Sequence, residues 1–269
     1  MFGNAKNGSV PLGDTRMSYV SFGSGEKNLI ILPGLSDGLA TVKGKALLLA
    51  GPYRPFLKRY TVYMFSRKDD MPEGYSIRDM AADQARACEA LGIRRTAVLG
   101  VSQGGMIAQF LAADFPELVE KLVIAVSAPY GNDIADACVR EWIRLAEAGD
   151  HKQLMIDTAE KSYSPEKLKT YRKLYPVIGL VGKPADYGRF LTNARAILGF
   201  DGVKDPGRII CPALIIGGEE DRIVGAEASR ELARMIPEST LYLYPGLGHA
   251  AYEEAPDFYR RVFDFLDRP

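Results

Sequence analysis

The stretch Gly100-Val101-Ser102-Gln103-Gly104-Gly105 decides the fold that this sequence predicts. A largely apolar run at residues 95–99 precedes it, and a second apolar run at residues 106–112 follows it. The first run is rich in aliphatic and β-branched residues, which is typical of a buried strand in a parallel sheet. The second run favours a helix that ends before Pro116. The stretch therefore predicts a tight turn from a strand into a helix, with Ser102 at its tip.

The pattern G-x-S-x-G around Ser102 is typical of a turn that exposes a nucleophilic serine. A serine at such a turn adopts strained backbone angles, and the flanking glycines leave room for the neighbouring backbone. The turn also points the N–H of Gln103 and the start of the helix at the anion that forms when Ser102 attacks a carbonyl. The pattern alone fits a glycine-rich turn with a solvated serine equally well. The hypothesis therefore depends on a base and an acid elsewhere in the chain.

Strands alternate with helices along much of the chain, which predicts an α/β fold with a mostly parallel central sheet and helices on both faces. Further strands are predicted at residues 16–22, 28–32, 60–65, 121–127, 211–218 and 239–244, and further helices at residues 53–59, 76–91, 226–235 and 257–266. The alternation stops at residues 130–207, which hold helical stretches at 133–147, 152–162 and 166–175 and no convincing strand. We therefore predict a core domain of residues 1–129 and 208–269 with a helical insertion of residues 130–207.

The composition gives no sign of a nucleic-acid-binding protein, a disulfide-rich protein or a membrane protein. Of the 269 residues 47% are hydrophobic and 25% charged, as in an ordinary globular protein, and the 34 basic residues balance the 34 acidic ones. This balance gives no reason to expect a nucleic-acid partner. The 3 cysteines, Cys88, Cys138 and Cys211, have neither metal nor redox spacing and fit reduced core thiols. Because no signal core and no membrane-span length are seen, we expect a cytoplasmic protein.

A serine nucleophile needs a general base, since an alcohol is a weak nucleophile at neutral pH. The chain has 2 histidines, His151 and His249. His249 follows a predicted strand on a glycine-rich loop, so it lies at the carboxyl edge of the sheet together with Ser102, where active sites of open α/β sheets form. His151 lies in a polar stretch between insertion helices and is interpreted as a solvated loop residue. The predicted base is therefore His249.

The base needs an acid that orients it and stabilises its charged form. Asp221 follows the strand at residues 211–218 and reaches the same edge of the sheet as Ser102 and His249. Glu219 and Glu220 share its turn and remain alternatives, and Asp133 is a weaker one. The order Ser102, Asp221, His249 along the chain is the order typical of α/β-hydrolases.

These segments together resemble the α/β-hydrolase superfamily, in its esterase, enol-lactonase and haloperoxidase-like branch. The resemblance covers nearly the whole chain and rests on residues 28–35, 100–105, 218–224, 248–249 and 254–258. It implies that Ser102 is the nucleophile, His249 the base and Asp221 the acid. It also implies an oxyanion hole made of the backbone N–H groups of Leu35 and Gln103, and a helical cap formed by residues 130–207.

One departure from the superfamily concerns the first oxyanion loop, where Pro33 stands in place of a common histidine. Pro33 removes only its own N–H, so donation from Leu35 survives the change. The neighbouring Ser36 and Asp37 are expected either to line the pocket or to cap the turn.

The resemblance implies a serine hydrolase that cleaves a small or medium ester, thioester or lactone through an acyl-enzyme, with no metal and no cofactor. The insertion is rich in aromatic residues, which suggest either an apolar pocket for such a small-molecule substrate or the core of the insertion itself: Tyr163, Tyr171, Tyr175, Tyr187, Phe190 and Phe200. The chain is expected to be a monomer or a homodimer. Two alternatives stay open: a carbon–carbon bond hydrolase or acyltransferase with the same three residues, and a ligand-binding or signalling protein with little turnover.

Overall fold

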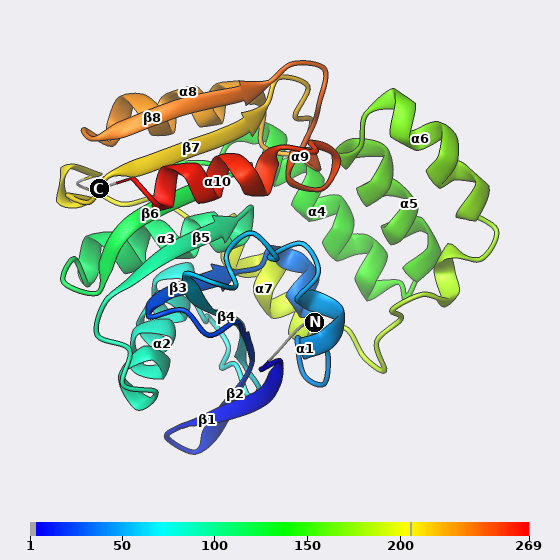
Figure 1. Cartoon of the computed structure of the whole chain (residues 1–269). Helices are drawn as coiled ribbons and strands as arrows, with labels where there is room; N and C mark the ends of the chain where they lie inside the picture. The colour runs from blue at the N-terminus through cyan, green and yellow to red at the C-terminus, as the bar shows by residue number, and fades with distance from the viewer. Residues whose placement is uncertain (1–3, 205, 269) are drawn as a thin grey trace.

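The computed structural model describes residues 4–204 and 206–268. Within these residues one sheet has the strand order β1-β2-β4-β3-β5-β6-β7-β8 (Figure 1). Its strands are β1 Lys6–Leu12, β2 Thr15–Phe22, β3 Lys27–Leu32, β4 Tyr60–Lys68, β5 Thr96–Val101, β6 Val119–Ala125, β7 Ala213–Gly218 and β8 Ser239–Tyr244. The pairings from β4 through β3 to β8 are all parallel, whereas β2 pairs antiparallel with both β1 and β4. The prediction of a mostly parallel α/β sheet is therefore confirmed.

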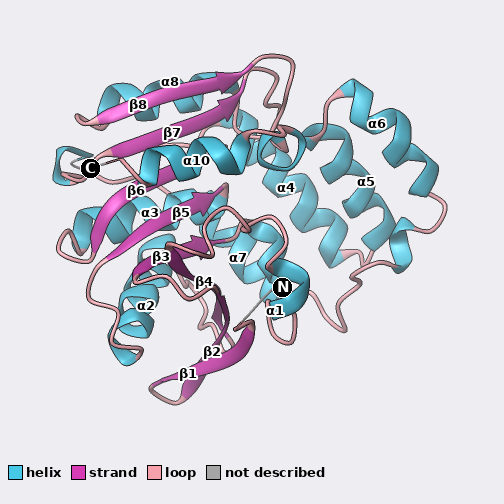
Figure 2. Cartoon of the chain, viewed as in Figure 1, coloured by secondary structure: helices cyan, strands magenta, loops and turns pink. Residues whose placement is uncertain are grey.

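Helices cover both faces of this sheet (Figure 2). One apolar core contains side chains of α2 Ile77–Ala90, α3 Gln103–Asp114 and α8 Ala226–Met235, and the other those of α1 Ala46–Leu49, α9 Ala251–Glu254 and α10 Phe258–Leu266. Successive residues of β3 alternate between the two cores: Ile30 belongs to the first, and Leu29 and Ile31 belong to the second. A strand with both faces buried needs an unbroken apolar run, which is the pattern that marked these strands in the sequence.

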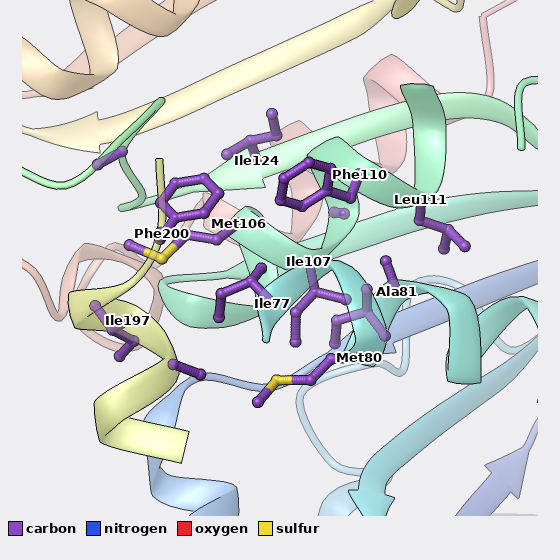
Figure 3. Packing of buried hydrophobic residues seen from close by; sticks show 14 of the residues in the cluster. Ile77, Met80, Ala81, Met106, Ile107, Phe110, Leu111, Ile124, Ile197 and Phe200 are labelled. Atoms are coloured by element: carbon purple, nitrogen blue, oxygen red, sulfur yellow. The ribbon is translucent and has the colours of Figure 1, made fainter. Parts of the chain in front are cut away.

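Figure 3 shows how the helix that follows Ser102 packs. Ile107 of α3 points toward Ile77 and Met80 of α2, and all three are almost fully buried. The start of α2 is held by a capping box, in which Ser76 Oγ accepts from the N–H of Asp79 and the Asp79 carboxylate accepts from the N–H of Ser76. This capping box anchors the helix against which α3 packs.

Residues 130–207 form a group of helices beyond the carboxyl ends of the strands (Figure 1). They are α4 Asp133–Glu147, α5 His151–Ser162, α6 Pro165–Tyr171 and α7 Gly188–Leu198. Two short 3-10 turns lie between α6 and α7, η2 Arg172–Leu174 and η3 Ile178–Leu180, and a third, η4 Pro206–Arg208, follows α7. Among the described residues of this segment there is no strand, as predicted. The indole N–H of Trp142 donates to Asp157 over 2.7 Å and joins α4 to α5.

Several details differ from the sequence predictions, among them α7, which was not predicted as a helix. The edge strand β1 was not predicted, because its sequence is polar and contains Pro11. Both features are tolerated in a strand that pairs with a neighbour on one side only. Residues 53–59 form turns with bonds three residues apart, such as Phe56 N–H to Tyr53 C=O, because Pro55 interrupts a regular helix. The helix predicted to end at residue 175 ends at Tyr171.

The cysteines Cys88, Cys138 and Cys211 are free and buried, in agreement with the expected core thiols. Across residues 4–204 and 206–268, no helix combines the length and the apolar character that a membrane crossing requires.

Candidate active site

Ser102 occupies the turn between β5 and α3 with a backbone φ of 55° and ψ of −120°. A positive φ is uncommon for serine and strains the backbone. The turn depends on its glycines: a Cβ on Gly100 would lie 2.4 Å from the carbonyl oxygen of Gly104, and one on Gly104 would lie 1.9 Å from that of Leu32. Because the Ser102 side chain does not cap α3, its hydroxyl is left to bond elsewhere.

The Ser102 hydroxyl bonds to the imidazole of His249. Ser102 Oγ lies 2.9 Å from His249 Nε2, and His249 Nδ1 lies 2.8 Å from Oδ2 of Asp221. An ionised carboxylate only accepts hydrogen bonds, so Nδ1 carries the proton and Nε2 of a neutral ring accepts from the serine. Three side chains from separate loops thus form one hydrogen-bonded chain.

Asp221 is held by the turn that follows β7. Its Oδ1 accepts from the backbone N–H of Ile223 at 2.8 Å and of Val224 at 3.0 Å, which leaves Oδ2 for His249. Burial of Asp221 opposes its ionisation, but attraction to His249 and the hydrogen bonds from His249 and the two N–H groups outweigh it and lower the pKa of the carboxyl. The carboxylate is therefore ionised at neutral pH.

The structure distinguishes Asp221 and His249 from the alternative acids and the second histidine. Glu219, Glu220 and Asp133 are exposed and none of them bonds to His249. The interpretation of His151 as a solvated loop residue is wrong: it is the first residue of α5 and is 2% exposed. The carbonyl of Val181, 2.9 Å from its Nε2, and the ring of Tyr187 cover it.

The loop that follows β3 lies directly against Ser102. A Cβ added to Gly34 would stand 3.3 Å from the Cβ of Ser102 and 3.8 Å from its Oγ. Leu35 begins the 3-10 turn η1 Leu35–Gly38, and Gln103 is the first residue of α3. In the described part of the chain, the N–H groups of Leu35 and Gln103 donate to no protein acceptor. Both predicted oxyanion donors therefore begin helical turns beside Ser102 with their N–H groups unused.

The sequence left two roles open for Ser36 and Asp37, lining the pocket or capping the turn, and the structure gives the two residues different environments. Ser36 lines the cavity at Ser102. Asp37 is 2% exposed, is not part of that lining and binds Arg67 and Arg189 instead. The carboxylate of Asp37 thus serves the interior and not the pocket.

A cavity of about 170 Å³ opens onto Ser102 and His249. The helices α4, α5 and α7 contribute Trp142, Leu154 and Phe190, and the other lining residues are Gly34, Leu35, Ser36, Leu39, Met155, Thr158, Ser162, Ile223 and Tyr252. Among them there is no lysine, arginine, aspartate or glutamate. A larger hollow, of about 760 Å³, lies at the far ends of α2 and α3 and contains none of the predicted site residues. Of these two hollows, the small cavity is the one that reaches Ser102 and His249.

Only part of the aromatic lining was predicted. Of the six aromatic residues that the sequence suggested for the pocket, Phe190 lines it. The lining residues of α5 at positions 154, 155, 158 and 162 share one helical face, a periodicity visible in the sequence. The sequence pattern marks such a face but does not indicate what it faces.

The arrangement suits attack on a carbonyl. His249 can take the Ser102 proton as Oγ attacks, and Asp221 can stabilise the resulting imidazolium. The unused N–H groups beside Ser102 can bind the oxygen that becomes negative. The geometry requires a substrate small enough for the cavity and an electrophilic carbon.

The chain matches known proteins along most of its length. The family model described as "Alpha/beta hydrolase family" matches residues 29–262. A putative carbamate hydrolase RutD from Pseudomonas savastanoi pv. phaseolicola is 27% identical over 215 residues, which are 74% of this chain and 78% of the relative. The 2-hydroxy-6-oxononadienedioate/2-hydroxy-6-oxononatrienedioate hydrolase 2 from Pseudomonas putida is 27% identical over 268 residues, covering 94% of this chain and 92% of that protein.

Solved structures show the same fold. The enol-lactonase from Burkholderia xenovorans LB400 superposes with a TM-score of 0.83 at 20% identity and covers 97% of this chain and 100% of its own. At this identity the likeness concerns the fold. The family match over residues 29–262 and the arrangement of the sheet agree, and the chain belongs to the alpha/beta hydrolase family.

Proposed function

We propose that this protein is a serine hydrolase that cleaves uncharged carboxylic esters, thioesters or lactones of small size. The observation that carries the proposal is the continuous hydrogen-bonded chain from Asp221 through His249 to Ser102. Its Ser102 end lies at an apolar cavity. A structural role explains this poorly, because a strained serine and a buried carboxylate both cost stability.

The proposed reaction has two halves. Ser102 Oγ attacks the carbonyl carbon while its proton passes to His249 Nε2, and the N–H groups of Leu35 and Gln103 bind the oxyanion. His249 then gives that proton to the departing alcohol or thiol, which leaves an acyl group on Ser102. In the second half, water attacks the acyl carbon as His249 takes its proton. The acid is released when the bond to Oγ breaks and His249 returns the proton to Ser102.

We further propose that residues 130–207 act as a cap over this cavity. Trp142, Leu154 and Phe190 of this segment line the cavity together with Ser102. Contacts with the loop of His249 hold the segment in place, since the carbonyl of Ser162 accepts from the N–H of Ala250 over 2.9 Å. A cap in this position excludes water from the reacting groups and limits the size of the substrate.

A fluorophosphonate probe tests the nucleophile directly. We expect one adduct per chain, which peptide mapping locates on Ser102, because the probe reacts with a serine whose proton is removed by a neighbouring base. Ser102→Ala and His249→Ala should show no adduct, whereas Ser36→Ala, which changes another serine of the cavity lining, should label as the wild type does. A well-folded wild-type protein that remains unlabelled would overturn the proposal and favour a ligand-binding protein.

The cavity predicts a preference for uncharged acyl groups. Its volume resembles the roughly 150 Å³ of an apolar cavity that binds benzene, so a pentanoyl group fits. A carboxylate at the end of the same chain would be buried without a partner, which costs several kcal/mol. We expect para-nitrophenyl pentanoate to have a kcat/KM at least about 100-fold higher than the mono-para-nitrophenyl ester of glutaric acid. Spectrophotometric release of nitrophenol measures both values.

The methyl ester of that glutarate is the control, because it removes the charge and lengthens the chain by only one methyl group. It should react at a rate near that of the pentanoate. Equal rates for the charged and uncharged esters would contradict the prediction. They would favour the second candidate, a carbon–carbon bond hydrolase, because the Pseudomonas putida relative is named for a dicarboxylate substrate.

A further inference from the structure

A cluster of buried polar side chains lies beneath the two segments that carry Leu35 and Gln103. It consists of Asp37, Arg67, Gln103, Arg189 and Asn193. Arg67, Gln103 and Asn193 are fully buried, and the side chain of Arg189 is 18% exposed. Hydrogen bonds satisfy only part of this polarity, because Oδ1 of Asp37, Nε and Nη1 of Arg67 and Oδ1 of Asn193 are buried without a partner among the described residues. The bonds that are formed show what the cluster holds together.

The Gln103 side chain points into this cluster. Its Oε1 accepts from Nη2 of Arg67 at 2.9 Å, and its Nε2 donates to the carbonyl of Asn193 in α7 at 2.7 Å. Both ends of the amide are therefore used, which restrains the first residue of α3. The N–H of the same residue is the proposed oxyanion donor.

Asp37, two residues after Leu35, joins the other donor segment to the same partners. Its Oδ2 accepts from the backbone N–H of Arg67 and from Nη2 of Arg189, both at 2.9 Å. Arg189 also donates to the carbonyls of Asp37, Arg67 and Lys68. Gln103 is thus bonded directly to the Arg67 guanidinium and to α7. Leu35 is linked only through Asp37, which binds the backbone N–H of Arg67 and the guanidinium of Arg189 in α7.

The charges of this cluster do not cancel. Asp37 forms an ion pair with Arg189, whereas no carboxylate in the described residues forms one with the Arg67 guanidinium. Burial lowers the pKa of Arg67, the attraction of Asp37 opposes this effect and the repulsion of Arg189 adds to it. An arginine nevertheless stays protonated in proteins. One positive charge therefore remains buried behind Gln103.

We propose that Arg67 is a positioning residue for the oxyanion step: its side chain holds Gln103 in place and puts a buried positive charge behind it, while its backbone N–H binds Asp37 of the Leu35 segment. The inference rests on the proposed hydrolase function. A charge in a medium of low polarity acts strongly on a negative charge that develops nearby, and a group held in advance needs no rearrangement during the reaction. Arg67 therefore favours the tetrahedral intermediate over the bound substrate.

The test compares Arg67→Met with Arg59→Met, which removes an exposed arginine just before the other end of β4. We expect Arg67→Met to lower kcat for para-nitrophenyl pentanoate by about 10- to 100-fold with KM within twofold, since removal of a direct oxyanion donor costs about 100- to 1,000-fold. The affinity for butylboronic acid, which forms a tetrahedral adduct with the serine, should fall in parallel. Arg67→Lys keeps the charge and should recover part of kcat. Arg59→Met should change neither quantity.

Arg67→Met leaves the Asp37–Arg189 pair intact, so the variant is expected to fold, and circular dichroism checks this. If it fails to fold, Gln103→Met breaks the bond to Arg67, together with the bond to Asn193, but keeps the Arg67 charge, and should give a smaller fall in kcat with KM again nearly unchanged. An unchanged kcat and boronate affinity in a folded variant, or a rise in KM alone, would overturn the inference while leaving the proposed function standing. A wild-type protein that neither labels with fluorophosphonate nor hydrolyses esters would remove both.

Discussion

Ser102→Ala is expected to lower kcat for an uncharged ester by about a million-fold, to the level that binding and the oxyanion donors sustain alone. The physical reason is that Oγ is the atom that forms the covalent bond, and no other hydroxyl occupies its place beside His249 Nε2 in the described structure. KM should change little, because the cavity that binds the acyl group remains. Burst and steady-state kinetics with para-nitrophenyl pentanoate measure both constants.

The double variant Ser102→Ala/His249→Ala is the informative companion. Nucleophile and base act as one unit, so the second change should cost almost nothing once the first has been made. Neither residue is expected to be needed for folding, and thermal unfolding of both variants checks this. A Ser102→Ala protein that keeps more than about a tenth of the wild-type kcat would show that the reaction proceeds without this nucleophile.

Asp221→Asn is expected to lower kcat by about 10⁴-fold while leaving the fold unchanged. The N–H groups of Ile223 and Val224 both donate to Oδ1, so the asparagine oxygen remains with them and its amide nitrogen faces His249 Nδ1. That nitrogen is a donor and favours the tautomer with the proton on Nε2. His249 can then no longer accept the proton of Ser102. Single-turnover kinetics of acylation measure this loss without the deacylation step.

Glu219→Gln is the matched control for Asp221→Asn. It makes the same change of carboxylate to amide on the same turn, at a residue that is exposed. We expect kcat to stay within twofold of the wild type. If Glu219→Gln lost the activity and Asp221→Asn kept it, the hydrogen bond from His249 to Asp221 would not be the one that orients the base.

The proposed chemistry depends on the lining of the cavity as much as on the three hydrogen-bonded side chains. Ester hydrolysis and carbon–carbon bond cleavage both begin at a carbonyl, so Ser102, His249 and Asp221 would serve either reaction. The described lining offers no charged partner for a carboxylate, which is why the proposal is restricted to uncharged substrates. The charged and uncharged esters above test this restriction to uncharged substrates.

Local sequence patterns determined most of the fold. The apolar runs of β3, β5, β6 and β7 are nearly continuous because both faces of these strands are buried, and burial on both faces leaves that signature in the sequence itself. The turn at Ser102 could also be predicted from the sequence. Its glycines are needed because neighbouring backbone, within a few residues and at the end of β3, leaves no room for a Cβ. His249 was identified because the chain offers only one alternative histidine.

Tertiary structure alone decided which groups meet. It singled out Asp221 from Glu219 and Glu220, because the direction of a side chain on a turn depends on what packs around that turn. It also placed His151 inside the protein, gathered Arg67 and Arg189 behind Gln103, and gave the cavity its lining. Such contacts join residues far apart, as Ser102 and His249 are 147 positions apart. A local pattern records whether a residue is buried, but the partner that burial gives it is set by the folded chain as a whole.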